Sequence, residues 1–112
     1  FNVRVAKCGG LLHSLAIAEF GLSAGLRVQV GAQVGETSLL SAAGRHLALH
    51  LAEVESVEGS FGTHLLSQDI TADPVMFGDA GRGNLLLGPG LGVSVDDQIV
   101  ERLATDVIRI EG

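Results

Sequence analysis

Valine and polar residues alternate along three short stretches of the chain, at residues 2–7 (NVRVAK), 27–31 (RVQVG) and 54–58 (VESVE). This period of two, carried by β-branched residues, predicts strands. Between them, residues 11–24 and 37–52 place apolar residues at every third or fourth position, which predicts helices with one apolar face. The order strand, helix, strand, helix, strand with short links is typical of parallel βα units.

The apolar faces of the two predicted helices consist of leucine and alanine. Gly25 is expected to end the first helix, because glycine adopts the left-handed conformation at a helix C-terminus without strain. We expect both faces to pack on the sheet. They comprise Leu11, Leu15, Ala18 and Leu22 in the first helix and Leu40, Ala43, Leu47 and Leu51 in the second.

The regular pattern stops after the third predicted strand. Residues 60–82 are predicted to be loop and residues 84–87 (NLLL) a short apolar strand. Residues 97–109 are predicted to be an amphipathic helix whose start is capped by Asp96 or Asp97.

Three parallel strands flanked by two helices leave the edges of the sheet open. Parallel sheets are usually covered on both faces and contain more strands. The pattern therefore predicts an α/β fold that is part of a larger barrel or of an open doubly wound sheet. The chain begins at Phe1 without a methionine, and we expect a longer protein upstream of it.

Composition narrows the classes of partner. The chain has 112 residues, which suits one domain, and a net charge of −6 without a basic stripe. Nucleic acid and anionic membrane surfaces are therefore not expected as partners. No apolar run approaches the roughly 18–20 residues of a membrane span. The single cysteine, Cys8, excludes an internal disulfide and fits a reducing compartment, so we expect a cytoplasmic protein.

Two cations lie in the first predicted strand. Alternation places Arg4 on one face with Asn2 and Ala6, and Lys7 on the other. A cation inside a barrel needs a carboxylate or an anionic ligand, because an unpaired buried charge is costly. Arg4 is therefore either a structural residue paired with a carboxylate of a neighbouring strand or a group that binds substrate. Lys7 is either a solvated lysine at a strand end or a substrate contact.

Carboxylates follow the second and third predicted strands. Glu58 shares a face with Ser56 and lies at the carboxyl end of its strand, the edge where barrel enzymes hold their active sites. It is a candidate substrate contact or a partner of Arg4. Glu36 precedes the second helix, where a carboxylate complements the helix dipole. A hydrogen-bonding or acid role in the site is the alternative for Glu36.

Other motifs give weaker signals. His46 and His50 are four residues apart on one helix, but the zinc motif HExxH is absent, so we expect no metal site among the histidines. Cys8 has no recognisable partner and is expected to pack. GPGLGV at residues 88–93 has the glycines of a nucleotide-binding loop, but a helix does not follow directly, so we reject that interpretation.

Several motifs occur together in an order that resembles a known family. They are KCGGL (7–11), AGLRVQVG (24–31), GETS (35–38), AAGRHLA (42–48) and GPGLGVSVDD (88–97). The set resembles the mandelate racemase and muconate-lactonizing branch of the enolase superfamily, over nearly the whole chain. The resemblance implies the sixth to eighth strands of a (β/α)7β barrel. Residues 1–59 would then hold the last βα units. Residues 60–112 would form a C-terminal segment that returns toward a capping domain and ends in a helix.

The resemblance also implies an activity. Enzymes of this group abstract a proton α to a carboxylate and stabilise the enediolate on Mg²⁺. The ligands of that ion lie on three earlier strands, so they are expected upstream of this chain, as is a first catalytic lysine. The resemblance thus implies a small carboxylate substrate, Mg²⁺ in the parent enzyme, contact with the rest of the barrel and the capping domain, and a homo-oligomeric parent.

Two departures from the family pattern bear on the reaction. Relatives usually have Lys-x-x-Lys-x-Gly-Gly at the first strand, and its first lysine is the second acid/base. That position is Arg4 here, and Lys7 fills the later one. Arginine is a poor general base at neutral pH, but it holds a carboxylate or developing negative charge well. Dipeptide epimerases of the group carry Asp-x-Asp on the eighth strand, where this chain has Ser56-Val57-Glu58.

These departures favour one-base chemistry, such as dehydration or cycloisomerisation. Arg4 and Glu36 are the candidate catalytic residues, and Lys7, Ser56 and Glu58 the candidate substrate contacts. An acid-sugar dehydratase and an amino-acid or dipeptide racemase or epimerase of the same group are alternatives. A non-catalytic barrel relative, with a structural role only, is the alternative from another class.

Overall fold

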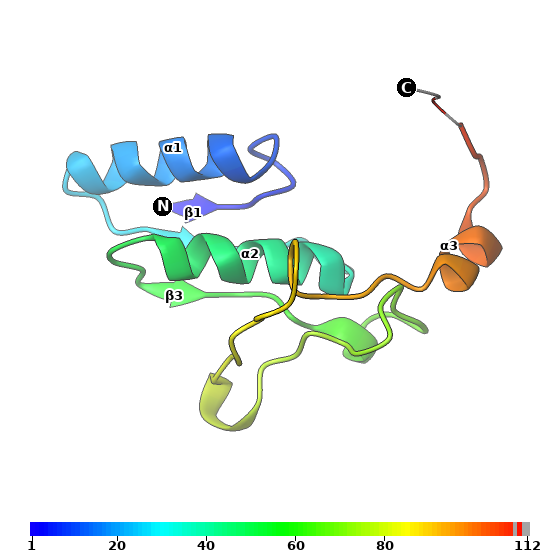
Figure 1. The fold of residues 1–112 in the computed structure, drawn as a ribbon. Helices are drawn as coiled ribbons and strands as arrows, with labels where there is room; N and C mark the ends of the chain where they lie inside the picture. Colours follow the sequence, from blue (N-terminus) through cyan, green and yellow to red (C-terminus); the bar gives the residue numbers. More distant parts are fainter. Residues whose placement is uncertain (109, 111–112) are drawn as a thin grey trace.

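The computed structural model describes residues 1–108 and 110. Its first half is a three-stranded parallel sheet with strand order β1-β2-β3, in which each strand is followed along the chain by a helix or a long segment (Figure 1). The elements of this half are β1 (Asn2–Val3), α1 (Leu11–Ser23), β2 (Gln29–Val30), α2 (Ser38–His50) and β3 (Ser56–Val57). The α/β fold predicted from the sequence is confirmed.

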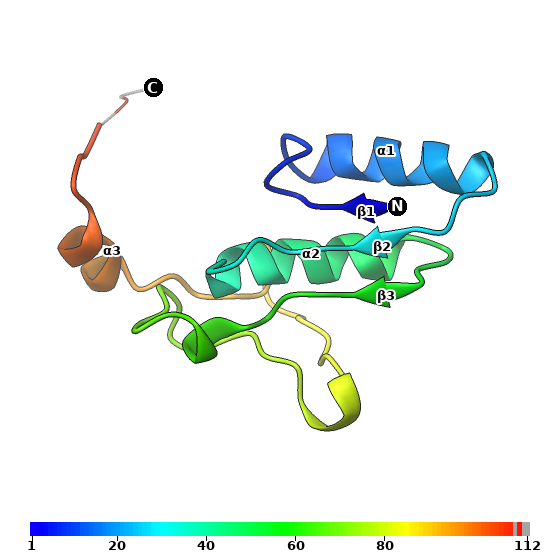
Figure 2. The same cartoon turned by 180° about the vertical axis from the view of Figure 1, so that it is seen from behind.

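Strand register separates an apolar face of the sheet from a polar one. Val3, Val30 and Val57 are in register on the face that the helices cover, and Val3 and Val30 are fully buried there. Both helices lie on this face, and Figure 2 shows the strands from the other side with no helix in front of them. All eight predicted helix-face residues pack in this core: Leu11, Leu15, Ala18, Leu22, Leu40, Ala43, Leu47 and Leu51.

The strands are shorter than the alternating pattern predicted. After β1 the backbone N–H groups of Lys7 and Cys8 both donate to the Arg4 carbonyl at 3.0 Å, and Gly10 N donates to the Val5 carbonyl at 3.1 Å. These bonds close a turn, so the predicted strand over residues 2–7 is wrong in its second half. Lys7 lies in this exposed turn and not on a sheet face. Alternation alone cannot tell such a turn from a strand end.

The first helix ends as predicted. Gly25 has φ +76, its N–H donates to the Leu22 carbonyl at 2.9 Å, and Leu26 N donates to the Gly21 carbonyl at 3.0 Å. This pair of bonds is the Schellman motif, which a left-handed glycine permits. The chain is thereby turned toward β2 after a short link.

Residues 58–96, between β3 and the last helix, contain two short 3₁₀ helices, η1 (Gly62–His64) and η2 (Asp79–Gly81), and are otherwise loops. The predicted strand over residues 84–87 is wrong: Leu85 and Leu87 are exposed, and that stretch is not paired with any strand of the described chain. An isolated antiparallel bridge joins Thr71 to Val95. This bridge lies outside residues 84–87, so it does not make that apolar stretch a strand.

The last helix, α3 (Asp97–Leu103), is capped by Asp96 and is shorter than predicted. The Asp96 carboxylate accepts hydrogen bonds from Gln98 N at 3.0 Å and Ile99 N at 3.2 Å, which settles which aspartate caps it. After Leu103 the backbone becomes extended. Residues 105–108 include β-branched side chains that lie in solvent and so gain no packing from a helix. Position 109 of the predicted helix lies outside the described residues.

None of the described helices is both long enough and apolar enough to cross a membrane.

Candidate functional site

The uncovered face of the sheet is polar and carries most of the candidate residues. Asn2, Gln29 and Ser56 are in register on it, one from each strand. Arg4, Gln33 and Glu58 follow these strands at their carboxyl ends. The carboxyl ends of parallel strands form the edge at which α/β barrels place their chemistry. The backbone thus gathers a cation, a carboxylate and several amides at one edge.

The Asn2 side-chain amide connects these groups. Its Oδ1 accepts a hydrogen bond from Arg4 Nε at 3.0 Å. Its Nδ2 donates to Gln29 Oε1 at 3.0 Å and makes a longer bond to Glu58 Oε2 at 3.5 Å. A second amide holds the other end of the guanidinium, because Arg4 Nη1 donates to Gln33 Oε1 at 3.4 Å. Neutral amides therefore fix the direction of Arg4.

Gly31 leaves the room for this arrangement. A Cβ built at Gly31 would overlap the Asn2 amide, since it would lie 2.6 Å from Asn2 Cγ. Gly31 does not adopt the left-handed conformation. A glycine is therefore needed here because a side chain would clash, and not because of the backbone conformation. Because Gly31, the residue directly after β2, has no side chain, the Asn2 amide of β1 can lie across it.

Arg4 is not paired with a carboxylate among the described residues. The ion pair of the described residues joins Arg27 Nη2 and Glu55 Oε1, which are 3.3 Å apart. Both residues precede their strands, so this pair lies at the amino ends of β2 and β3, away from Arg4. Of the two alternatives for Arg4, the described residues do not show the pairing with a carboxylate of a neighbouring strand. Glu58 and Arg4 are linked only through the Asn2 amide. The Arg4 guanidinium is thus held by the Asn2 and Gln33 amides and not by an ion pair within the described residues.

Glu36 lies at the same edge but is turned toward its own loop. Its Oε1 accepts a hydrogen bond from Gln33 N at 2.7 Å, which closes the turn between β2 and α2. It therefore braces the backbone of Gln33, the residue whose side chain holds Arg4. The structure brings Arg4, Glu36 and Glu58 to one edge, and Ser56 lies deeper on the same face, one strand from Gln29. Lys7 lies apart, in the exposed turn after β1.

Sequence reasoning missed the amides of this site. The alternating pattern places Asn2 on the face of Arg4 and Gln29 on the same face of the next strand, whereas Gln33 lies beyond the alternating stretch. Amide side chains are uncharged and belong to no recognisable motif, so their position in the strand register is the only sequence signal that they belong to the site.

The start of α2 is held by a buried carboxylate from the long C-terminal segment. Asp69 is 4% exposed and accepts hydrogen bonds from Ser38 N at 3.1 and 3.0 Å and from Ser38 Oγ at 2.6 Å. Ile70 N and the Thr71 N and Oγ1 also donate to it. Asp69 thereby supplies the helix cap that Thr37, the residue before α2, does not make.

The hydrogen bonds control the ionisation of Asp69. Burial acts to raise the pKa of this carboxyl, but the hydrogen bonds from Ser38, Ile70 and Thr71 together outweigh burial and hold the pKa below its usual value. Asp69 is therefore a structural carboxylate, engaged on all sides, and it is not available to a substrate.

The described residues do not supply a magnesium site. No three histidine, cysteine, aspartate or glutamate side chains within residues 1–108 and 110 converge on one point. Mg²⁺ is bound by several oxygen ligands, which include carboxylates. Glu36 and Glu58 are too few for this and are engaged with Gln33 N and Asn2.

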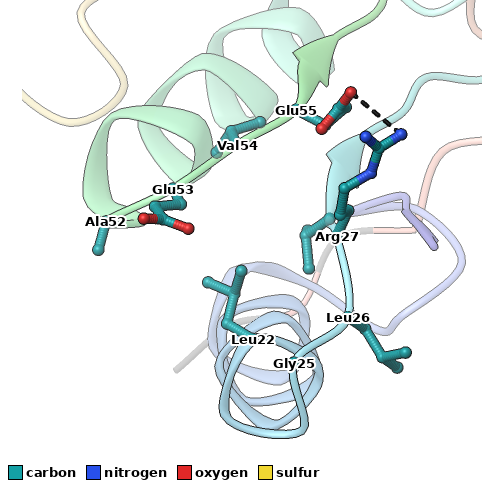
Figure 3. A pocket seen from close by; sticks show the side chains of 9 residues that line it. Leu22, Gly25, Leu26, Arg27, Ala52, Glu53, Val54 and Glu55 are labelled. Carbon is teal, nitrogen blue, oxygen red and sulfur yellow. Dashed lines mark ion pairs between the residues drawn. The ribbon is translucent and has the colours of Figure 1, made fainter.

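A hollow of about 680 Å³ lies at the other end of the sheet. Arg27 and Glu55 form their ion pair at its edge, and Leu22 points into it from the end of α1 (Figure 3). In barrels this amino-terminal end of the strands serves stability and not chemistry. It is lined by Leu22, Gly25, Leu26, Arg27, Val28, Ala52, Glu53, Val54 and Glu55.

Comparison with known proteins adds a family to this geometry. Residues 1–99 match the family model described as Enolase C-terminal domain-like. The chain is 31% identical over 110 residues to N-succinyl-L-Arg/Lys racemase of Bacillus cereus, and 26% identical over 106 residues to muconate cycloisomerase 1-1 of Acinetobacter lwoffii. These alignments cover 96% and 95% of this chain.

Solved structures show the same likeness. The crystal structure of the Bacillus cereus racemase superimposes with a TM-score of 0.80 at 31% identity over 96% of this chain. Muconate cycloisomerase from Pseudomonas fluorescens superimposes with a TM-score of 0.82 at 29% identity over 95% of it. The chain spans only 28% and 27% of the two curated relatives, and 28% and 29% of the two solved chains.

Proposed function

Because this chain belongs to the enolase C-terminal domain-like family, in the mandelate racemase and muconate-lactonizing branch of the enolase superfamily, we propose that it serves as the closing part of an enzyme barrel. The proposed enzyme abstracts a proton α to the carboxylate of a small substrate. The likeness to a racemase and to cycloisomerases supports an enzymatic parent. The short span of the chain on these relatives supports a longer parent, with the rest of the barrel and a capping domain.

The position of Arg4 carries the proposal. It stands where the family pattern has a lysine, and it faces the open side of the sheet with only amides around its guanidinium. A planar guanidinium binds a carboxylate through two parallel hydrogen bonds and remains protonated at neutral pH. We assign Arg4 the role of holding the substrate carboxylate or the negative charge that develops on it.

The neighbouring residues then have defined tasks. Asn2 and Gln33 hold the guanidinium in one direction, so little of its rotational freedom is lost when a substrate binds. Glu58 is free on the side away from Asn2 and suits a hydrogen-bond donor or an ammonium group of the substrate. Glu36 contributes through the backbone of Gln33. Ser56 and Lys7 are further substrate contacts in this proposal, Ser56 from the sheet face and Lys7 from the turn.

The base that removes the proton is assigned to the part of the enzyme outside this chain. Arginine is a poor general base at neutral pH, so the proposed reaction uses one base, as a dehydration or cycloisomerisation does. The Mg²⁺ ligands implied by the family are also assigned to residues outside this chain, because the described residues do not form a ligand set. A cytoplasmic, homo-oligomeric parent completes the proposal.

Racemisation is the second candidate, since one relative with 31% identity is a racemase. Racemisation needs an acid/base group on each face of the reacting carbon, and Arg4 occupies the position of one of them. The two candidates therefore differ in whether solvent exchanges the α-proton from one face or from both.

Proton exchange in deuterated water tests the proposal. The full-length protein that contains this chain is incubated with Mg²⁺ and a panel of acid sugars, dipeptides, N-acylated amino acids and hydroxy acids, and deuterium uptake at the α-carbon is followed by NMR. We expect uptake or conversion of at least one substrate from one face only. Uptake from both faces would establish racemisation instead, and no uptake by any member would overturn the enzymatic proposal.

A further inference from the structure

Ser60 has a strained backbone two residues after Glu58, at the carboxyl end of β3. Its φ is +56, in the left-handed region that residues with a side chain rarely adopt. Such conformations persist only where the surrounding structure determines them more than once, and they cluster at functional sites. Glu58 and Ser60 are separated by a single glycine, Gly59, so the strain lies at the carboxyl end of β3.

Two buried hydrogen bonds hold Ser60 in this conformation. Its N–H donates to Ser41 Oγ at 3.2 Å, and its own Oγ accepts from Arg45 Nη2 at 3.2 Å. Ser60, Ser41 and Arg45 are 6%, 7% and 7% exposed. Both partners belong to α2, which packs on the sheet. We call Ser60, Ser41 and Arg45 the serine lock.

Arg45 is a buried cation without a carboxylate partner among the described residues. Besides Ser60, it donates to the Met76 carbonyl at 3.2 Å and the Asn84 carbonyl at 3.0 Å, and its Cζ lies 5.1 Å from the centre of the Phe77 ring. Its Nε is buried without a hydrogen-bond partner, and burial lowers the pKa of Arg45. These contacts are to carbonyl and hydroxyl oxygens and an aromatic ring, and none is to a carboxylate. The forked guanidinium can donate hydrogen bonds to several of these groups at once, which explains why an arginine lies here.

The other side of Glu58 is equally fixed. Glu58 N donates to the Val30 carbonyl at 2.8 Å, the last link of β3 to β2. Gly59, with φ +108, lets the backbone lie close to the link after β2, since a Cβ there would be 2.9 Å from Ala32 Cβ. Glu58 is thus held on one side by the sheet and on the other, through Gly59, by the serine lock.

We propose that Ser60 is a positioning residue for Glu58: Arg45 and Ser41 hold Ser60 in a left-handed conformation that fixes where the β3 end presents the Glu58 carboxylate to the substrate. The part that concerns substrate rests on the proposed function. A plain docking role for Arg45, which only fastens residues 60–84 to α2, predicts no effect of Ser60 on Glu58. The two ideas are separable because Ser60→Ala removes one Oγ and leaves the bonds of Arg45 to Met76 and Asn84 in place.

Hydrogen–deuterium exchange of the full-length protein gives the first test, without any substrate. In Ser60→Ala we expect the Glu58 amide to exchange at least about tenfold faster, because the strand end opens locally. Peptides from 69–84 should be unchanged. Ser67→Ala, which alters an exposed serine of the same segment, is the matched control and should change neither. Unchanged exchange at Glu58 in Ser60→Ala, or equal acceleration throughout 69–84, would overturn the proposal.

Ser60→Gly guards against a variant that does not fold. Glycine adopts the left-handed conformation freely, so this variant relieves the strain while it also removes the Oγ. We expect it to unfold at a temperature no lower than Ser60→Ala does and still to show the faster Glu58 exchange. If the Glu58 amide stays as protected as in the unchanged protein, the lock does not position the strand end.

Kinetics give the second test, with the carboxylate that the exchange screen identifies. We expect Ser60→Ala to raise KM about tenfold with kcat changed by less than about threefold, and to have no further effect in a Glu58→Gln background, as residues acting through one another do. An equal effect of Ser60→Ala in both backgrounds would overturn the proposal. If the screen identifies no substrate, the proposed function fails, and the exchange at the Glu58 amide still decides whether the lock exists.

Discussion

The side chain of Asn2 occupies the space that Gly31 leaves on the neighbouring strand. From there its amide accepts from Arg4 Nε at 3.0 Å and donates to Gln29 Oε1 at 3.0 Å. The missing side chain of Gly31, directly after β2, therefore sets the direction of Arg4, which follows β1. The relationship is steric, because Gly31 has an ordinary backbone conformation, and it leads directly to an experiment.

Gly31→Ala should disturb the site more than the fold. The added methyl group would overlap the Asn2 amide, which must move and release Arg4. Misplacing a substrate-holding group by about 1 Å costs up to about a hundredfold in rate, so we expect kcat/KM to fall at least about tenfold. Steady-state kinetics and a crystal structure of the variant would measure both effects.

Gly44→Ala is the matched control for Gly31→Ala. A Cβ at Gly44 would lie 3.8 Å from Val30 Cγ1, an ordinary contact, and alanine favours the helix in which Gly44 lies. We expect unchanged kcat/KM and a slightly higher thermal midpoint. Full activity in Gly31→Ala would show that Asn2 does not direct Arg4.

Arg4→Lys should change the stereochemistry of proton exchange. A lysine keeps the charge but loses the fork that Asn2 and Gln33 hold, so we expect KM for the carboxylate substrate to rise about tenfold. Unlike arginine, a lysine amine can accept a proton when neighbouring groups lower its pKa. NMR in deuterated water should therefore detect α-proton exchange from the second face, which is absent before the change.

The control for Arg4→Lys is the same substitution, arginine to lysine, at an arginine far from the site. Arg27 is exposed and pairs with Glu55 at the other end of the sheet, so Arg27→Lys should leave KM and the exchanged face unaltered. If the Arg4→Lys variant showed no α-proton exchange from the second face and kept the original KM, Arg4 would have no part in the reaction.

Asp69→Asn should loosen the start of α2. The amide keeps one oxygen acceptor but loses the charge that strengthens the bonds from Ser38, Ile70 and Thr71. Loss of hydrogen bonds to a buried charged group costs about 1–3 kcal/mol, which lowers the thermal midpoint and speeds amide exchange in the first turn of α2. Asp73→Asn, an exposed aspartate of the same segment, should leave both measurements unchanged.

The same carboxylate should make stability depend on pH in the acid range. The pKa of Asp69 is lowered in the folded protein, so its contribution to stability is complete above the unfolded value of about 3.9 and is lost as the pH falls through the folded value. The stability difference between the unchanged protein and Asp69→Asn should therefore shrink as the pH falls below about 4, as urea unfolding at several pH values would show. A difference that stays constant to about pH 2 would contradict this account.

The apolar pattern predicted the framework well, because it reports directly on packing. Leu15 and Leu47 recur at helical spacing and both contact the core, and Val3 and Val30 alternate with polar residues and both are buried. Gly25 predicted the end of α1 because glycine adopts the left-handed conformation of a helix C-terminus without strain. The family motifs were confirmed by the match over residues 1–99.

The contacts of polar residues could not be predicted from the same pattern. Asp69 caps a helix that begins 31 residues earlier, and no local signal connects the two. Arg45 lies within the AAGRHLA motif of residues 42–48, but the motif does not predict that Arg45 is buried. Its burial depends on the loops of residues 60–84, whose sequence has no hydrophobic periodicity. Lys7 looked like a strand residue because the turn after Arg4 is made by backbone bonds alone, which any sequence can form.

The two-residue strands also separate two kinds of evolutionary constraint. The volumes of Val3 and Val30 are fixed by the helices behind them, whereas Asn2 and Gln29, one position earlier in the same strands, lie on the face of the sheet that the two helices leave open. Substitutions on that side can accumulate without any change in how the barrel wall is assembled. A racemase and cycloisomerases can therefore diverge in chemistry while their backbones still superimpose on this one.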